Sequence, residues 1–118
     1  MRLAWAALVL ALCGAVMAQQ APGEQEAKLI AVLKSDANEQ QKMDACRELA
    51  RVGTAAAVPA LAALLSDEKL SHVARYGLEQ IGLPAVDEAL RTALGSLKGI
   101  QRVGVIDSLG ARRDLRDE

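Results

Sequence analysis

The stretch CRELARVG, residues 46–53, returns twice along the chain in altered form, as RYGLEQIG at residues 75–82 and as VGVIDSLG at residues 103–110. The closing glycines are 29 and 28 residues apart; in each copy one aliphatic residue directly precedes the glycine and another lies four positions before it. A two-helix unit of this length cannot bury its apolar face alone, so neighbouring units must stack. The repeat therefore predicts an all-α fold, an α-solenoid of stacked helix pairs.

Helical periodicity extends on both sides of these copies. Ala, Leu, Glu, Gln, Lys and Arg dominate, and apolar residues recur at spacings of three and four, without strand signals. Asn38 and Gln41 have the spacing of a capping box, and Pro84 suits a first helical turn. The pattern predicts helices at about 24–34, 39–52, 55–65, 69–81, 84–97 and 98–109, with the last one ending at Gly110.

A family resemblance follows from the residues after the first glycine. GTAAAVPALAALLSD, residues 53–67, resembles the turn and second helix of short bacterial HEAT repeats, including the HEAT-like units of the phycobilisome-lyase group. LSHVARY at 70–76 and VGVIDSLGARRD at 103–114 are similar to secreted bacterial HEAT proteins. The resemblance covers residues 27–114 and implies about two complete helix pairs with partial units at each end, before a polar tail at 115–118. HEAT arrays are mostly binding scaffolds without a shared chemistry, so it implies protein–protein interaction.

The amino-terminal segment has the pattern of an export signal. Arg2 is followed by an uncharged apolar run over residues 3–18, which ends on small residues before Gln19. This three-part pattern predicts a signal peptide at 1–18, cleaved after Ala18, and a polar linker at 19–26. We therefore expect an exported protein, periplasmic or extracellular.

Two alternatives exist for this segment. An uncleaved membrane anchor would need about 20 apolar residues, and Gly14 already interrupts the run. A lipoprotein would be modified at Cys13, but bulky Leu12 stands where a small residue normally precedes such a cysteine. Both alternatives fit less well than a cleaved signal, so no stable membrane span is expected in the mature chain.

Composition excludes several classes of partner. The chain has 14 basic and 15 acidic residues; without Arg2 the basic count is 13 and the formal charge of the mature chain is −2. Such a chain lacks the basic stripe that nucleic-acid binding requires. Tyr76 is the only aromatic residue after position 18, which argues against stacking platforms for bases or sugars. Cys46 is the single cysteine of that part, so we expect a buried thiol and no intrachain disulfide.

No catalytic motif is recognisable, and we expect neither enzyme activity nor a metal or cofactor. The one candidate site on a single helix is a polar patch of His72, Arg75, Tyr76 and Glu79. It would serve as a binding patch or proton-transfer site. The simpler interpretation is a solvated helix face with an Arg75–Glu79 pair, because a general base needs a partner and a pocket.

A second candidate surface is a basic strip in the last third of the chain, with Arg91 and Arg102 as its test residues. Such a strip would recruit an acidic protein surface, whereas the simpler interpretation is a solvated surface paired with nearby carboxylates. The full set of basic residues is Arg91, Lys98, Arg102, Arg112 and Arg113.

The sequence thus favours an exported, non-catalytic HEAT-repeat scaffold that binds a protein partner. The alternative is an accessory or amino-terminal module of a larger secreted enzyme or redox protein, including a lyase-like role. An apolar stripe on the last helix has no second helix of its own unit to cover it, and the helix at 84–97 is expected to cover it only in part, so self-association through this end is also expected. The stripe consists of Ile100, Val103, Ile106 and Leu109.

Overall fold

The structure, a computed structural model, describes residues 22–117. All regular elements in this range are helical, which confirms the predicted all-α class. The predicted signal peptide, its cleavage site at Ala18 and the cysteine of the lipoprotein alternative lie outside the described residues. The elements are α2 (Pro22–Lys34), α3 (Glu39–Val52), a 3₁₀ turn η1 (Ala55–Ala57), α4 (Val58–Ala62), α5 (Ser71–Ile81), α6 (Pro84–Leu94) and α7 (Gly99–Asp117).

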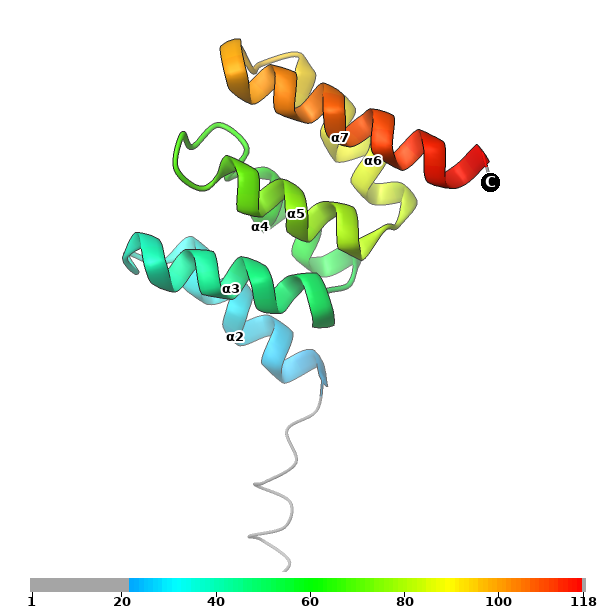
Figure 1. Cartoon of the computed structure of the whole chain (residues 1–118). Helices are drawn as coiled ribbons and strands as arrows, with labels where there is room; N and C mark the ends of the chain where they lie inside the picture. Colours follow the sequence, from blue (N-terminus) through cyan, green and yellow to red (C-terminus); the bar gives the residue numbers. More distant parts are fainter. Residues whose placement is uncertain (1–21, 118) are drawn as a thin grey trace, which may run out of the picture.

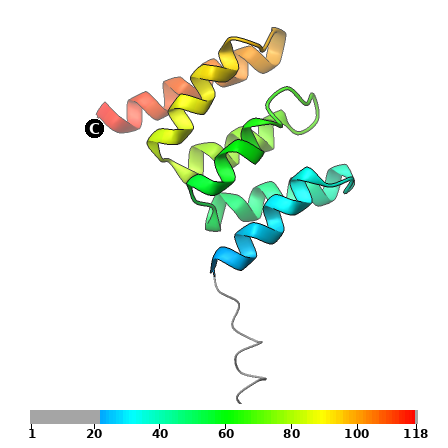
Figure 2. The same cartoon turned by 180° about the vertical axis from the view of Figure 1, so that it is seen from behind.

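The helices form two layers of three (Figures 1 and 2). Helices α3, α5 and α7 lie side by side in one layer, and α2, α4 and α6 lie behind them. Each front helix contacts the rear helix that precedes it in the chain, so that α2 packs with α3, α4 with α5 and α6 with α7. Neighbours also touch within each layer, most extensively α3 and α5. The described chain is therefore a domain of six α-helices in contacting pairs.

Helix α3 begins and ends where the sequence predicts, and its capping residues explain why. Asn38 accepts a hydrogen bond from the Gln41 backbone at 2.8 Å, and the Asn38 N–H donates to Gln41 Oε1 at 3.0 Å, which closes the capping box. Gly53 ends α3, and Gly82 ends α5 in the left-handed conformation with φ of 66°. That conformation is natural for glycine because it has no Cβ.

The region around η1 and α4 differs from the continuous helix predicted at 55–65. Thr54 Oγ1 accepts a hydrogen bond from the Ala56 N–H and starts a 3₁₀ turn, and only Val58–Ala62 is α-helical. Beyond Ala62 the backbone forms tighter bonds between residues three apart, as in Leu64 to Leu61. The pattern of apolar spacing cannot distinguish such turns from an α-helix, because both bury one face.

Other helix limits also differ from prediction. Helix α2 begins at Pro22, inside the segment predicted as a linker, and α6 ends at Leu94 rather than at 97. Helix α7 continues through Gly110 to Asp117, so the predicted stop at Gly110 is wrong. Gly110 keeps a negative φ, since only Gly82 and Gly99 have positive values among the described glycines. A glycine permits a helix end but does not enforce one.

The core runs along the interface between the two layers. Gly77 allows α5 to approach α3 closely, because a Cβ there would lie 3.3 Å from the Cys46 carbonyl oxygen. Cys46 has no exposed surface, as the sequence predicts. No helix within residues 22–117 has both the length and the apolar character that a membrane span requires. The largest fully buried side chains are Leu49, Leu61, Leu65, Leu78, Leu90, Val86, Val105, Cys46 and Ser108.

Helix α7 turns a different face to the core from the one that carries the predicted apolar stripe. Val105, Ser108 and Arg112 are buried, whereas most of the predicted apolar stripe points to solvent. Leu109 is half-buried and packs against the core, but the other three members of the stripe stay exposed. The expected partial cover from the preceding helix is therefore limited to Leu109 among these residues.

Candidate binding groove between α3 and α5

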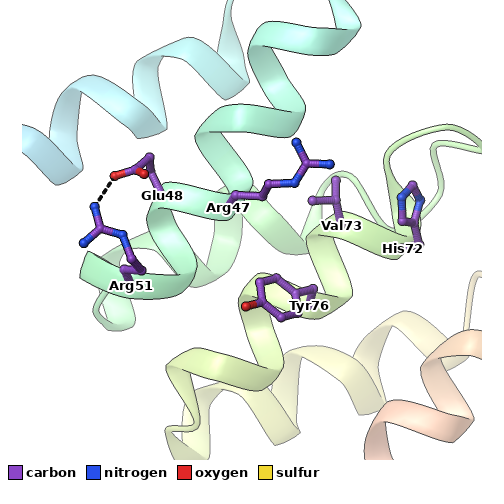
Figure 3. Close-up of a pocket in the computed structure, with 6 residues that line it drawn as sticks. All are labelled: Arg47, Glu48, Arg51, His72, Val73 and Tyr76. Carbon is purple, nitrogen blue, oxygen red and sulfur yellow. Dashed lines mark hydrogen bonds and ion pairs between the residues drawn. The ribbon is translucent and has the colours of Figure 1, made fainter.

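A groove of about 520 Å³ lies between the two helices that pack most extensively, α3 and α5 (Figure 3). We treat it as the main candidate for a binding site because a half-exposed aromatic residue and several charged side chains line it together. Three lining residues come from each helix: Arg47, Glu48 and Arg51 from α3, and His72, Val73 and Tyr76 from α5.

Helical spacing places these residues along the groove. Residues 47, 48 and 51 share one side of α3, and residues 72, 73 and 76 share one side of α5, because side chains three and four positions apart lie together. Val73 is buried and contributes apolar surface, while the Tyr76 side chain is 49% exposed. An incoming side chain would meet an aromatic ring beside aliphatic surface.

The charges on the α3 side are arranged in pairs. The Arg47 guanidinium lies 3.2 Å from the Asp44 carboxylate, and Arg51 pairs with Glu48. The four side chains are 43–67% exposed, so each pair contributes little to stability and opens readily for a ligand. The α3 side of the groove is therefore lined with both donors and acceptors.

The four residues of the polar patch that the sequence predicts on α5 do not all line the groove. His72 and Tyr76 line the groove, whereas Arg75 and Glu79 are not among its lining residues. Arg75 turns toward α7, where Nη1 donates to the Gly104 carbonyl oxygen at 3.2 Å. The predicted Arg75–Glu79 ion pair is not present among the described residues. That part of the simpler interpretation is therefore wrong, because the Arg75 guanidinium points toward α7 instead.

Arg91 and Arg102 have separate surroundings. Arg91 lines a smaller hollow of about 270 Å³ between α6 and α7, together with Asp87 and Arg113. Arg102 donates to the Leu94 carbonyl oxygen at the end of α6, a position where a cation favourably caps a helix. Of the predicted basic strip, Arg112 is buried and so does not present its charge to a partner.

Sequence reasoning missed the α3 half of the groove. Arg47 and Arg51 carried an available signal, because the repeat alignment sets 46–53 beside 75–82 and predicts that the two helices are neighbours. The alignment sets Arg47 beside Tyr76 and Arg51 beside Gln80, so it indicates that Arg47 lies near Tyr76.

Two polar contacts that join separate elements are buried, whereas the sequence predicted solvated charges in the region of Asp87 and Arg112. Arg112 Nε and Nη2 each donate to Asp87 at 3.0 Å, and Nη2 also reaches the Leu83 carbonyl oxygen at 3.3 Å. Glu26 on α2 accepts from the Thr54 hydroxyl at 3.0 Å, beside the start of η1. These contacts satisfy buried charges and fix neighbouring helices, and they lie outside the groove.

Comparison of the chain with protein-family models, with curated proteins and with solved structures finds no match. The fold and the groove define the class: an all-helical domain of paired helices with an open groove on its α3 and α5 side, lined by charged and apolar residues.

Proposed function

We propose that this protein is an exported, non-catalytic scaffold, an α-solenoid of the HEAT-repeat kind that binds a protein partner in the groove between α3 and α5. The two-layer arrangement of helix pairs supports the solenoid, because each pair contacts the next within both layers. The 29- and 28-residue spacing of the repeated glycines supports it independently.

The observation that carries the proposal is the half-exposed Tyr76 in a groove that the arginines of α3 and His72 also line (Figure 3). Tyrosine and arginine are the residue types that supply much of the energy of protein interfaces. A partner is expected to place an apolar side chain against Tyr76 and Val73. Its polar groups would exchange with the exposed pairs of Arg47 and Arg51.

Site-specific crosslinking tests this function. A photoreactive amino acid replaces His72 in the groove, and a control variant carries it at Ala31, an exposed position on α2 in the other layer. After irradiation in cells, a protein partner should be captured from position 72 and not from position 31. Equal capture at the two positions, or none at 72, contradicts a binding role for the groove.

The captured partner then permits a quantitative measurement. Tyr76→Ala should weaken binding of the purified partner by about tenfold or more, as the loss of an interface anchor does. Lys28→Ala is the control, because Lys28 is exposed on α2 and does not line the groove. An unchanged Kd for Tyr76→Ala would place the binding surface elsewhere.

A second role is favoured by the exposed apolar residues of α7, which a further domain would cover. In this role the protein is an accessory module of a larger secreted enzyme or redox protein, including a lyase-like one. Reading the coding region in frame beyond Glu118 distinguishes the two roles. A catalytic or haem-binding domain there would support the accessory role.

A further inference from the structure

Exposed apolar surface is concentrated on α7. Five large apolar side chains are exposed in the described part of the chain, and three of them belong to this helix. Ile100 is 80% exposed, Val103 56% and Ile106 48%. Their spacing of three residues puts them on one stripe, opposite the buried side that carries Val105 and Arg112. Among the described helices, α7 lies with α6 at one end of the arrangement and α2 at the other (Figure 1).

We propose that this stripe binds the same stripe of a second copy of the chain, with the two α7 helices antiparallel about a two-fold axis at Val103. The stripe is symmetric about its middle residue. In the antiparallel arrangement Val103 of one copy meets Val103 of the other, and Ile100 of each meets Ile106 of its partner. Such a self-complementary patch is what a closed two-fold dimer requires.

Charge at the two ends of the stripe selects the antiparallel direction. Lys98 precedes the stripe and Asp107 follows it, and both are exposed. Antiparallel packing brings Lys98 of each copy close to Asp107 of the other, whereas parallel packing would bring like charges together. Neither residue belongs to an ion pair among the described side chains of residues 23–113, so both charges are available to a partner.

The opposite end of the domain offers no comparable surface. The exposed residues of α2 include Lys28, Ala31 and Lys34, and none of the exposed large apolar side chains of the described chain lies on this helix. In a head-to-tail contact, the apolar stripe of α7 would therefore pack against the polar side chains of α2 in the next copy. Among the residues that the structure describes, the α7 stripe of a second copy is the best apolar match, which favours a closed dimer over an open filament.

The contact is small, with three aliphatic side chains from each copy. It falls below the size of a standard stable interface, so the dimer is weak, with a Kd on the order of 100 µM. Sedimentation velocity of the full chain over about 10 µM to 1 mM covers the range in which such a dimer forms.

Charge reversal tests the direction of the contact. Lys98→Glu and Asp107→Lys each create two repulsive pairs in the dimer, and each should raise Kd about tenfold at low salt. An equimolar mixture of the two variants restores both attractive pairs and should recover the wild-type Kd as a heterodimer. A mixture that dimerises no better than the single variants would overturn the antiparallel model.

Cysteine crosslinking tests the axis itself, in the background Cys13→Ser, where Cys46 stays buried. Val103→Cys should form a disulfide-linked dimer under mild oxidation, faster than the control Ala31→Cys. Ile100→Cys should crosslink poorly with itself but readily with Ile106→Cys in a mixture. Equal rates at positions 103 and 31 would overturn the proposal, and so would preferential crosslinking of Ile100→Cys with itself.

Discussion

At the residue scale, the Asp87–Arg112 pair is the most demanding feature of the fold. The two side chains are 5% and 7% exposed, and the bidentate contact compensates the cost of burying both charges. The pair connects α6 to α7 and carries an additional bond to the Leu83 carbonyl oxygen. It therefore fixes how α7 is rotated against its neighbour.

Replacing Arg112 by Ala should lower the free energy of unfolding by about 3 kcal/mol, because the buried Asp87 carboxylate loses both guanidinium bonds. Urea titration measures this change. Arg113→Ala, at the neighbouring exposed position, should change stability by less than about 0.5 kcal/mol. Equal effects of the two substitutions would mean that the buried pair does not hold α7 in place.

Cys46 gives the second prediction at this scale. Burial raises the pKa of its thiol from 9.0 to about 11, against a smaller opposing effect of the Arg47 charge. Because the folded pKa exceeds the unfolded one, the resulting stabilisation is complete below pH 9 and disappears as the pH rises to about 11. Unfolding curves should thus show an extra loss of stability over this interval that Cys46→Ala lacks.

The same burial makes the native thiol unreactive. A thiol reagent at neutral pH should label Cys46 slowly in the folded chain and quickly in urea, with Cys13 replaced by Ser to remove the other thiol. Fast labelling of the native protein would show that α3 exposes this side of the helix.

At the element scale, the contact of α5 with α7 depends on a missing side chain. A Cβ on Gly104 would lie 2.6 Å from Arg75 Cζ and 2.7 Å from Nε, so α7 can accommodate the guanidinium only where it has a glycine. Arg75 in turn donates to the Gly104 carbonyl oxygen. The contact between α5 and α7 therefore depends on both residues, Arg75 on α5 and Gly104 on α7.

A double-mutant cycle tests this contact. In an Arg75→Ala background, Gly104→Ala should stabilise the protein by about 1 kcal/mol, because alanine is the better helix former. In the wild-type background the same change must displace the guanidinium, and the gain should be smaller or reversed. Thermal unfolding of the four proteins gives the coupling energy. A coupling near zero would show that Arg75 does not pack on α7.

At the scale of the whole molecule, neighbouring helices cover the central helices more completely than they cover α7. Helix α5 is packed between α3 and α7, whereas one side of α7 carries exposed aliphatic residues. Amide hydrogen exchange, measured below the concentration at which dimers form, should be slower across 39–81 than across 98–110. The comparison requires dilution because self-association through α7 would protect its amides. Equal protection in the monomer would mean that α7 is as firmly held as the central helices.

The candidate groove shows the limit of sequence reasoning at this scale. His72 and Tyr76 were recognisable from one helix, since their spacing of four places them on the same face. Arg47 and Arg51 belong to a different helix, and their position beside Tyr76 depends on how closely α3 and α5 approach at Gly77. Arg75 shares the helix of Tyr76, yet its long side chain leaves the groove for Gly104.

The sequence by itself determined the helical class, the limits of α3, the glycine that ends α5 and the burial of Cys46, because periodicity, capping residues and helix ends act between residues a few positions apart. Only the tertiary structure decided that α7 passes through Gly110, that it buries Arg112 on Asp87, and that Leu109 is the member of the apolar stripe that packs against the core. These outcomes depend on contacts between residues about 25–29 positions apart. Such contacts are set by the rotation and spacing of neighbouring helices, which no local pattern specifies.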